Sequence, residues 1–435
     1  MRFRNFLEMD FILLFAMLIL VVFGILFIYS SGLTSEGLLI SKEYLRQIIW
    51  ASAGLVFALV ISMLNYRRIY DSCIYIYLGG LVLLLFTFFF GKIISGTRWI
   101  RLGSFGFQAS EFTKISTILF LAWYLDSTKR NQKTLSRFAV SSAIVLVPML
   151  LVLIQPDLGT ALVYIPILIG MTYMAGASLR YIVFFILTIC ITGFLIVLPL
   201  WQTTIMQNSI PSLMTLTNTR FVILSCLVLL LVTLVSMYGF VRFGRRYFYW
   251  IFYFTGILDI SLFISFAAQK VLKQYQIMRL IVFMDPNVDP RGFGWQIIQS
   301  ITAIGSGGVF GKGYLQGTQS HYRYLPEQST DFIFSILAEE WGFLGGIIVF
   351  SLFLVIILRL SRIIRLTTDT FGYFIVAGLF SIFSFHFFVN VGMTMGIMPI
   401  TGIPLTFVSY GGSALLSSMI GIGLALSVHA RRFIH

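Results

Sequence analysis

Charged side chains are scarce in this sequence. Only 11% of its 435 residues are Asp, Glu, Lys or Arg, whereas 58% are hydrophobic. A soluble domain carries roughly twice that charged fraction, because its surface has to face water. The composition therefore excludes a soluble globular protein and predicts an all-α polytopic integral membrane protein.

Cysteine, histidine and acidic residues are also few. Cys73, Cys190 and Cys226 lie in or beside apolar stretches, so they indicate neither a disulfide framework nor a metal-ligand spacing. The four histidines do not cluster, so no zinc site is predicted. The 30 basic and 16 acidic residues give a net charge of +14. The basic residues occupy short loops between apolar runs, where they set membrane orientation and do not indicate nucleic-acid binding.

Apolar runs long enough to span a bilayer, about 17–25 residues each, recur along the whole chain. They begin near residues 10, 45, 72, 110, 138, 157, 181, 220, 247, 332, 372 and 405. The first run, Phe11 to Tyr29, is too long for a signal peptide and has no small-residue cleavage site. We therefore expect about 12 transmembrane helices in one membrane domain covering residues 1–435.

The basic loops test this count. If the N-terminus is cytoplasmic, every second loop is basic, as the positive-inside rule requires. These loops contain Arg67 and Arg68; Lys129, Arg130, Lys133 and Arg137; Arg180; Arg242, Arg245 and Arg246; Arg359, Arg362 and Arg365; and Arg431 and Arg432. The alternation predicts cytoplasmic termini and an extracytoplasmic loop over about residues 268–330. Within it, Lys270 to Met284 mixes cations with large apolar side chains, which favours a helix in the membrane interface.

The outer loop ends at Asp331, where the next apolar helix begins, and Glu339 and Glu340 follow about two turns later. Ionised groups near mid-bilayer cost about 2.5–3.5 kcal/mol each, so they indicate a functional site. Two interpretations of Asp331 stay open. With Ser329 and Thr330 it suits a helix N-cap, and at the membrane surface it could equally serve as a general base or bind a metal ion.

Glu111 and Lys114 are three residues apart and share one face of the fourth predicted helix. Either they form a structural ion pair, or Lys114 binds an anionic head group. Asp157, which follows Pro156 in the next outer loop, suits the N-cap of the sixth helix. Arg98 and Trp99 in the preceding outer loop are typical of an interfacial aromatic anchor or of a diphosphate clamp.

Two glycine-rich segments complete the candidate regions. Gly305 to Gly313 fails the phosphate-loop pattern of nucleotide-binding proteins, but its backbone amides could hold a phosphate with Lys312 nearby. Asn390 to Gly412 contains two proline–glycine breaks in an apolar region. This pattern predicts a broken or re-entrant helix lining a cavity, because free backbone groups cannot face lipid.

Six blocks together resemble the SEDS family (shape, elongation, division and sporulation), the peptidoglycan polymerases of RodA, FtsW and SpoVE type. They are GTRWIRLGSFGFQASEFTK (96–114), QPDLGTA (155–161), QSITAIGSGGVFGKG (299–313), LPEQSTDFIF (325–334), AEEWGFLGG (338–346) and the 390–412 segment ending VSYGG. The resemblance covers nearly the whole chain except about residues 201–267. The NVGM and GIMPITGIP segments and the short N-terminal tail are closest to the RodA branch.

The resemblance implies a glycosyltransferase that polymerises lipid II, an undecaprenyl-diphosphate-linked disaccharide pentapeptide. The reaction would take place at the outer face of the bacterial cytoplasmic (inner) membrane during cell elongation. The family's essential aspartate matches Asp331. The substrate-binding residues would be Glu111, Lys114, Arg98, Trp99, Asp157, Lys312 and Glu327. The implied partners are lipid II, membrane lipids and a class B penicillin-binding protein, a transpeptidase; no nucleic acid is expected.

The sequence departs from the family pattern twice. Ala109 stands where the family commonly has proline, which we expect to alter only the local helix start. Family members usually have ten spans, so residues 201–267 are predicted to be an inserted pair. Because a pair preserves parity, Asp331 stays on the outer side.

The resemblance also suggests an inverting transfer in which Asp331 takes the proton from the acceptor hydroxyl. Lys114, Arg98, and Lys312 or a divalent cation (Mg²⁺ or Mn²⁺) would meet the charge of the leaving diphosphate. Three alternatives remain: a lipid II flippase, a division-specific polymerase of the FtsW type, and a scaffold that only recruits the transpeptidase. The residues alone support a polymerase and a transporter equally.

Overall fold

A computed structural model describes residues 8–94, 99–102, 105–131, 134–204 and 218–432. The chain divides into two compact units, residues 1–177 with 295–435, and residues 178–294. The described part is almost entirely helical; its one sheet is a two-stranded antiparallel hairpin in which Ile100 pairs with Phe107. The all-α prediction is therefore confirmed in its main feature.

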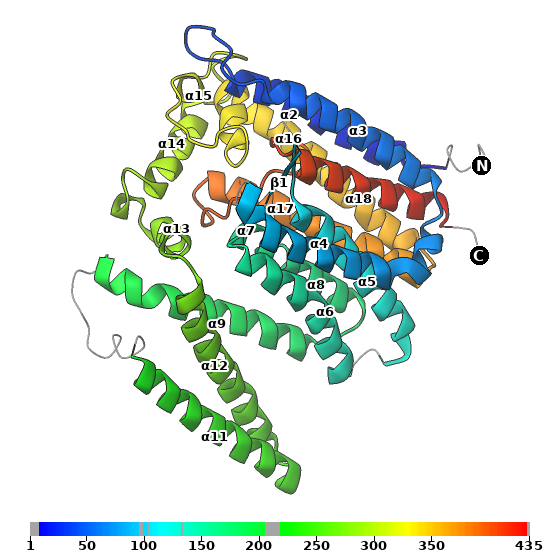
Figure 1. The fold of residues 1–435 in the computed structure, drawn as a ribbon, viewed down its shortest axis with the longest axis vertical. Helices are drawn as coiled ribbons and strands as arrows, with labels where there is room; N and C mark the ends of the chain where they lie inside the picture. The colour runs from blue at the N-terminus through cyan, green and yellow to red at the C-terminus, as the bar shows by residue number, and fades with distance from the viewer. Residues whose placement is uncertain (1–7, 95–98, 103–104, 132–133, 205–217, 433–435) are drawn as a thin grey trace. The chain divides into compact units, whose positions relative to one another are not determined.

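The first unit contains most of the helices (Figure 1). Its elements are α2 (Phe11–Ser31), α3 (Glu43–Met63), η1 (Tyr66–Ser72), α4 (Cys73–Ile94), β1 (Ile100–Leu102), β2 (Phe105–Phe107), α5 (Ala109–Ser127), η2 (Lys129–Asn131), α6 (Leu135–Ile154), α7 (Leu158–Leu162), α8 (Tyr164–Met174), α15 (Thr318–His321), α16 (Ile333–Leu366), α17 (Thr370–Thr394) and α18 (Gly412–Ala430). α14 (Phe293–Ser306) begins at the boundary between the units and lies mostly in the first.

The second unit consists of α9 (Leu179–Thr204), α11 (Thr219–Phe243), α12 (Arg246–Val271), α13 (Gln274–Met284) and η4 (Pro286–Val288). α11 and α12 form an antiparallel pair, and α12 also packs against α9. The predicted interface segment from Lys270 divides between the end of α12 and α13. Ile277 and Ile281 of α13 form a small apolar core with Ile196 of α9. That residues 201–267 are an insertion stays a prediction.

Ten of the described helices are long and apolar enough to cross a membrane. The other two predicted spans are also helical, but they differ in composition and length. Every 18-residue window of α5 contains Glu111, Lys114 and Asp126, and α7–α8 is a shorter helical stretch of 17 residues. The last span begins at Gly412 and not near residue 405, because residues 395–411 form an irregular segment.

The centre of the first unit is formed by α17 and α18, whose membrane-length segments are 72% and 78% buried. In Figure 1, α18 (red) runs beside α3 (blue). Glycine permits the close approach: a Cβ on Gly423 would lie 2.6 Å from the carbonyl oxygen of Ala58 on α3. Small residues at such crossings let helix backbones pack tightly in lipid, where no hydrophobic force drives helices together.

Two arginines of the predicted cytoplasmic loops also donate hydrogen bonds to the carbonyl groups at helix ends. Arg137 is buried, and its guanidinium donates to the carbonyl oxygens of Leu125 near the end of α5 (2.6 Å) and Ala175 after α8 (3.0 Å). Arg431 donates in the same way to Met63 at the end of α3 (2.6 Å). Terminal carbonyls have no partner within their own helix, so these arginines satisfy groups that lipid could not.

We expect Arg137→Met to lower the unfolding free energy by about 3 kcal/mol, because two buried carbonyls lose charged donors. Thermal unfolding of the purified protein in detergent measures this. Arg130→Met is the matched control, since Arg130 is exposed on the connection that precedes α6, the helix that carries Arg137. Equal stability of the two variants would contradict the idea that Arg137 stabilises the fold by bonding to these helix-end carbonyls.

Candidate functional site

The glycine-rich loop before α16 forms hydrogen bonds and an ion pair with two carboxylates of that helix, Glu339 and Glu340. The Glu339 side chain is completely buried. It accepts hydrogen bonds from the Lys312 amino group (2.8 Å) and from the backbone N–H groups of Thr318 (2.7 Å) and Gln319 (2.9 Å). A buried carboxylate is tolerated when charge and hydrogen bonds compensate it, and Glu339 has both.

Glu340 is equally buried and fixes the other part of the loop. It accepts from the Leu315 backbone N–H (3.2 Å) and from the hydroxyl of Ser30 on α2. His321 lies 3.7 Å away through Nε2. Burial lowers the pKa of His321, opposed by the Glu339 carboxylate, so the imidazole is neutral at pH 7. The loop is thereby tied to both α16 and α2.

The helix α16 is interrupted at one glycine, and backbone groups of the same loop form hydrogen bonds with the interrupted turn. Gly342 has φ +64°, which is outside the helical region. The N–H groups of Phe343 and Leu344 therefore donate to Gly308 (2.9 Å) and Val309 (3.2 Å), while the carbonyls of Glu339 and Glu340 accept from Lys312 and Gly313. Four backbone bonds to the loop replace the helical ones, as non-helical backbone at membrane depth requires.

Asp331 lies in the turn that leads into α16. Its backbone N–H donates to the Glu327 carbonyl (3.1 Å), and its carbonyl accepts from the Asn390 side chain of α17 (3.0 Å). Asn390 also donates to Ile403 in the irregular 395–411 segment (2.8 Å). The N-cap of α16 is Phe332, without a side-chain cap bond, so Asp331 is not the N-cap. Its half-buried side chain is held in place from two directions through the backbone.

A second polar cluster meets the 395–411 segment and the start of α18. The Asp157 carboxylate accepts from the Thr160 N–H at the start of α7 (3.2 Å), which confirms the capping prediction. It also accepts from the Gln108 side chain before α5 (2.9 Å). The Gln108 N–H donates to the Ser413 hydroxyl of α18 (3.0 Å). Two motif blocks and the start of α18, all distant in sequence, are thus joined.

Glu111 and Lys114 form the predicted ion pair at 2.8 Å, with only 5% of each side chain exposed. The Ser417 hydroxyl of α18 donates to Glu111 (3.3 Å). This geometry fits the structural interpretation of the pair. Binding of an anionic head group by Lys114 stays a prediction.

The remaining candidates are more dispersed. Trp99 is 37% exposed and its ring lies against Gly106 of the β1–β2 hairpin. Arg98 lies outside the described residues. Glu327 is exposed and has φ +49°, with its carboxylate accepting from the Thr330 hydroxyl (3.3 Å). Lys312 pairs with Glu339, and 26% of its side chain is exposed.

Sequence reasoning missed the buried amides that connect the blocks. Besides Gln108 and Asn390, Gln47 of α3 is completely buried. Its side chain donates to the Ser409 carbonyl (3.1 Å) and accepts from the Gly411 N–H (3.3 Å). An uncharged amide within or beside an apolar run was the available signal, because such a group is buried only with partners.

No group of three or more His, Cys, Asp or Glu side chains that could hold a metal occurs among the residues that the structure describes. The buried carboxylates instead accept from lysine, hydroxyl and amide groups. A divalent cation therefore stays a prediction, without ligands assigned to it.

The fold and the site define a multi-pass membrane protein whose polar centre is built from broken helices. Comparison with known proteins identifies it more closely. The family model described as "Cell cycle protein", of the FtsW, RodA and SpoVE type, matches residues 11–218 and 221–433. The chain belongs to this family, and the resemblance seen in the sequence is confirmed.

Curated relatives match over nearly their full length. Peptidoglycan glycosyltransferase RodA of Treponema pallidum is 49% identical over 433 residues, covering 99% of this chain and 100% of that protein. Peptidoglycan glycosyltransferase MrdB of Escherichia coli K12 is 31% identical, covering 98% and 94%. The first name supports the RodA branch.

Solved structures share the fold. A chain from the structure titled "Structural coordination of polymerization and crosslinking by a peptidoglycan synthase complex" is 25% identical with a TM-score of 0.64, covering 98% of this chain and 99% of that one. The crystal structure of the Thermus thermophilus rod shape determining protein RodA has a TM-score of 0.60 at 22% identity, covering 99% and 100%. At that identity the second likeness concerns the fold alone.

We expect Lys312→Met to destabilise the protein by about 3 kcal/mol, because it leaves the buried Glu339 carboxylate without its cation. The double variant Lys312→Met with Glu339→Gln should recover much of this loss. Thermal unfolding and limited proteolysis of the 305–330 loop measure both effects. If Lys312→Met unfolds like the wild type but needs more lipid II for half-maximal rate, Lys312 binds substrate instead.

Proposed function

We propose that this protein is a peptidoglycan glycosyltransferase that polymerises lipid II during cell elongation. The observation that carries the proposal is the position of Asp331. The turn containing it is held by Asn390 of α17, and the Ser329 carbonyl accepts from the Tyr410 N–H (2.8 Å). A carboxylate in a fixed turn beside an irregular segment suits a general base, which must be positioned before the substrate arrives. The names of the 49% and 31% identical relatives support the same activity.

The reaction is a glycosyl transfer with inversion. Asp331 accepts the proton of the 4-hydroxyl on the acceptor's GlcNAc. The freed oxygen forms a bond to the anomeric carbon of the MurNAc at the lipid end of the growing strand. The bond from that carbon to undecaprenyl diphosphate breaks, and the diphosphate leaves with the electron pair. A positioned base contributes about 10²–10⁴-fold to such a step.

The charge of the leaving diphosphate requires donors near Asp331. Lys114 and Lys312 both pair with carboxylates, so each offers only part of its charge to a ligand. We propose that Arg98 and Trp99 clamp the diphosphate, with Lys114 contributing from α5, and that Asp157 and Glu327 shape the sugar site. A divalent cation would supply further charge stabilisation. In this proposal Asp331 carries out the proton transfer itself.

We also propose the membrane placement that the basic loops predict. The protein would lie in the bacterial cytoplasmic membrane with both termini inside and Asp331 on the outer side. α5 and α7–α8 would add to the ten long apolar helices to give about 12 spans. An apolar cavity of about 330 Å³, lined by residues such as Ile61, Leu83 and Phe112, has the chemistry of a lipid-tail site. The protein partner would be a class B penicillin-binding protein, consistent with a similar chain in a peptidoglycan synthase complex.

A lipid II flippase is the second candidate. The break at Gly342 and the irregular segment 395–411 favour it, because transporters place their sites at such discontinuous helices. An assay with purified protein and lipid II separates the two functions. A polymerase produces glycan strands in detergent, where no leaflets exist, whereas a transporter produces none.

We expect Asp331→Asn to reduce glycan polymerisation at least about 100-fold, since the amide cannot accept the hydroxyl proton. Lipid II binding and thermal unfolding should stay near wild type, because the side chain keeps its shape. The control is Glu36→Gln, which removes one exposed acid from another predicted outer loop. Polymerisation by Asp331→Asn at the wild-type rate would refute the assignment.

A further inference from the structure

The second unit has a carboxylate at the middle of a predicted span. Asp259 is the fourteenth of the 26 residues of α12. At 1.5 Å per residue it lies about 20 Å from either end of the helix. Acids at this depth face a partner, a cavity or another protein, because lipid cannot solvate them.

Asp259 lies along the seam between α11 and α12. The Cys226 thiol of α11 donates a hydrogen bond to its carboxylate. The Thr233 and Thr255 hydroxyls make a second bond across the same two helices (2.9 Å). The opposite face of α12 packs on α9 through Ser261, whose hydroxyl donates to the Thr188 carbonyl (3.2 Å). The α11–α12 seam is therefore a separate surface from the α9 contact.

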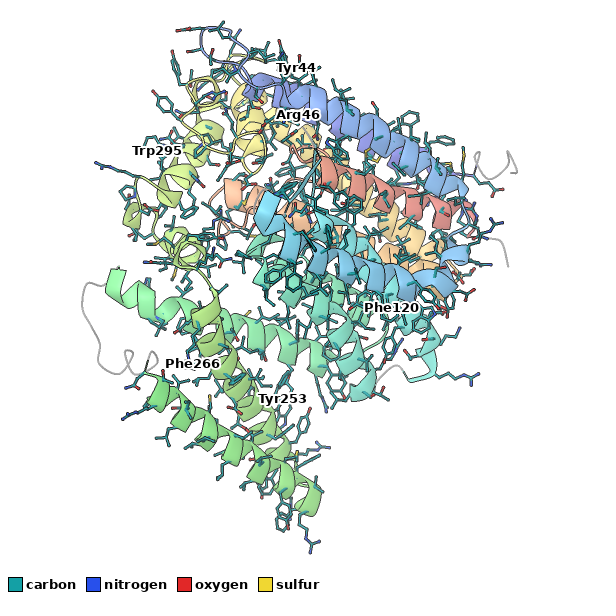
Figure 2. The ribbon with its side chains drawn as sticks, viewed as in Figure 1. Tyr44, Arg46, Phe120, Tyr253, Phe266 and Trp295 are labelled. Atoms are coloured by element: carbon teal, nitrogen blue, oxygen red, sulfur yellow. The ribbon has the colours of Figure 1, made fainter. Side chains whose placement is uncertain are left out.

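The seam is incompletely covered. Asp259 itself is half-exposed, and its neighbours Leu258 and Phe263 are 44% and 65% exposed. On α11, Leu227 and Leu230, both within about 100° of Cys226 around the helix, are 58% and 45% exposed. In Figure 2, Tyr253 and Phe266 mark the stretch of α12 that carries this acid.

No cation pairs with Asp259 within the described ranges. The basic residues of the two helices stand at their ends: Arg220, Arg242, Arg246 and Lys270. Glu111 and Glu339 differ from Asp259, since they pair with Lys114 and Lys312. A thiol is a weak donor and does not replace a cation.

We propose that the α11–α12 seam docks a transmembrane helix of another protein that carries a lysine or arginine at mid-membrane. The cation of that helix pairs with Asp259, and its apolar flanks pack on the exposed leucines and phenylalanine of the seam. Charge complementarity selects this occupant over a purely apolar helix. A second copy of the chain is a poor match, because symmetric pairing would bring carboxylate to carboxylate and its basic residues lie only at the helix ends.

The test uses the full-length protein in phosphatidylcholine vesicles with synthetic transmembrane peptides of leucine and alanine. One peptide has lysine at its central residue and the matched peptide has leucine there. Energy transfer from labelled peptide to labelled protein, titrated against the peptide-to-lipid ratio, gives the affinity. We expect the lysine peptide to bind wild type about tenfold more tightly, equivalent to about 1.4 kcal/mol.

Three variants test whether the preference for the lysine peptide depends on the Asp259 carboxylate. Asp259→Asn should bind both peptides alike, Asp259→Glu should keep the preference, and Glu36→Gln should behave as wild type. Equal binding of the two peptides by wild type overturns the proposal, even if Asp259→Asn misfolds. So does an unchanged preference in a folded Asp259→Asn. Self-association of labelled wild-type copies that Asp259→Asn abolishes, without any peptide preference, would assign the seam to a second copy.

Discussion

The exchange of backbone hydrogen bonds at Gly342 is the constraint on which the site depends. A helix interrupted within a membrane leaves amide and carbonyl groups that lipid cannot satisfy. Here the 307–313 loop supplies all four partners, and Gly311 must be glycine because a Cβ there would lie 2.1 Å from the Glu340 carbonyl oxygen. The loop in turn brings Lys312 to Glu339. The backbone bonds at the α16 break and the Lys312–Glu339 ion pair therefore stabilise each other.

This anchoring determines how rigid the turn that contains Asp331 can be. Asp331 stands two residues before α16, and Glu339 and Glu340 stand about two turns inside it, so the loop and the turn share one support. Asn390 and Tyr410 add contacts from the 395–411 segment. Buried charges are a poor source of net stability, but they are strongly destabilising when one partner is lost. Their arrangement here favours a single conformation of the loop, which suits a site that must be organised before a large lipid-linked substrate enters.

Much of the fold could be predicted from the sequence, because apolar length and basic loops report directly on membrane helices. The Asp157 cap and the Glu111–Lys114 pair followed from local spacing. At Asp331 local spacing left a helix N-cap and a general base both open, and the turn beginning at Glu327 makes Phe332 the N-cap of α16. Local spacing also could not show that Glu339 and Glu340 bind a loop about twenty residues upstream, or that Gln47, Gln108 and Asn390 join distant blocks. Those contacts depend on tertiary packing, which periodicity does not encode.

Most buried carboxylates of the membrane helices are paired with a cation. Asp10 pairs with Arg359 at 2.7 Å, Glu111 with Lys114 and Glu339 with Lys312, so a cation meets each of these three carboxylates, whereas the buried Glu340 accepts from a hydroxyl and a backbone N–H. An unpaired carboxylate in hydrocarbon costs about 2.5–3.5 kcal/mol on insertion scales. The thiol of Cys226 gives Asp259 much less compensation than these cations give the other three. The partner cation proposed for Asp259 would follow the same rule as these internal pairs.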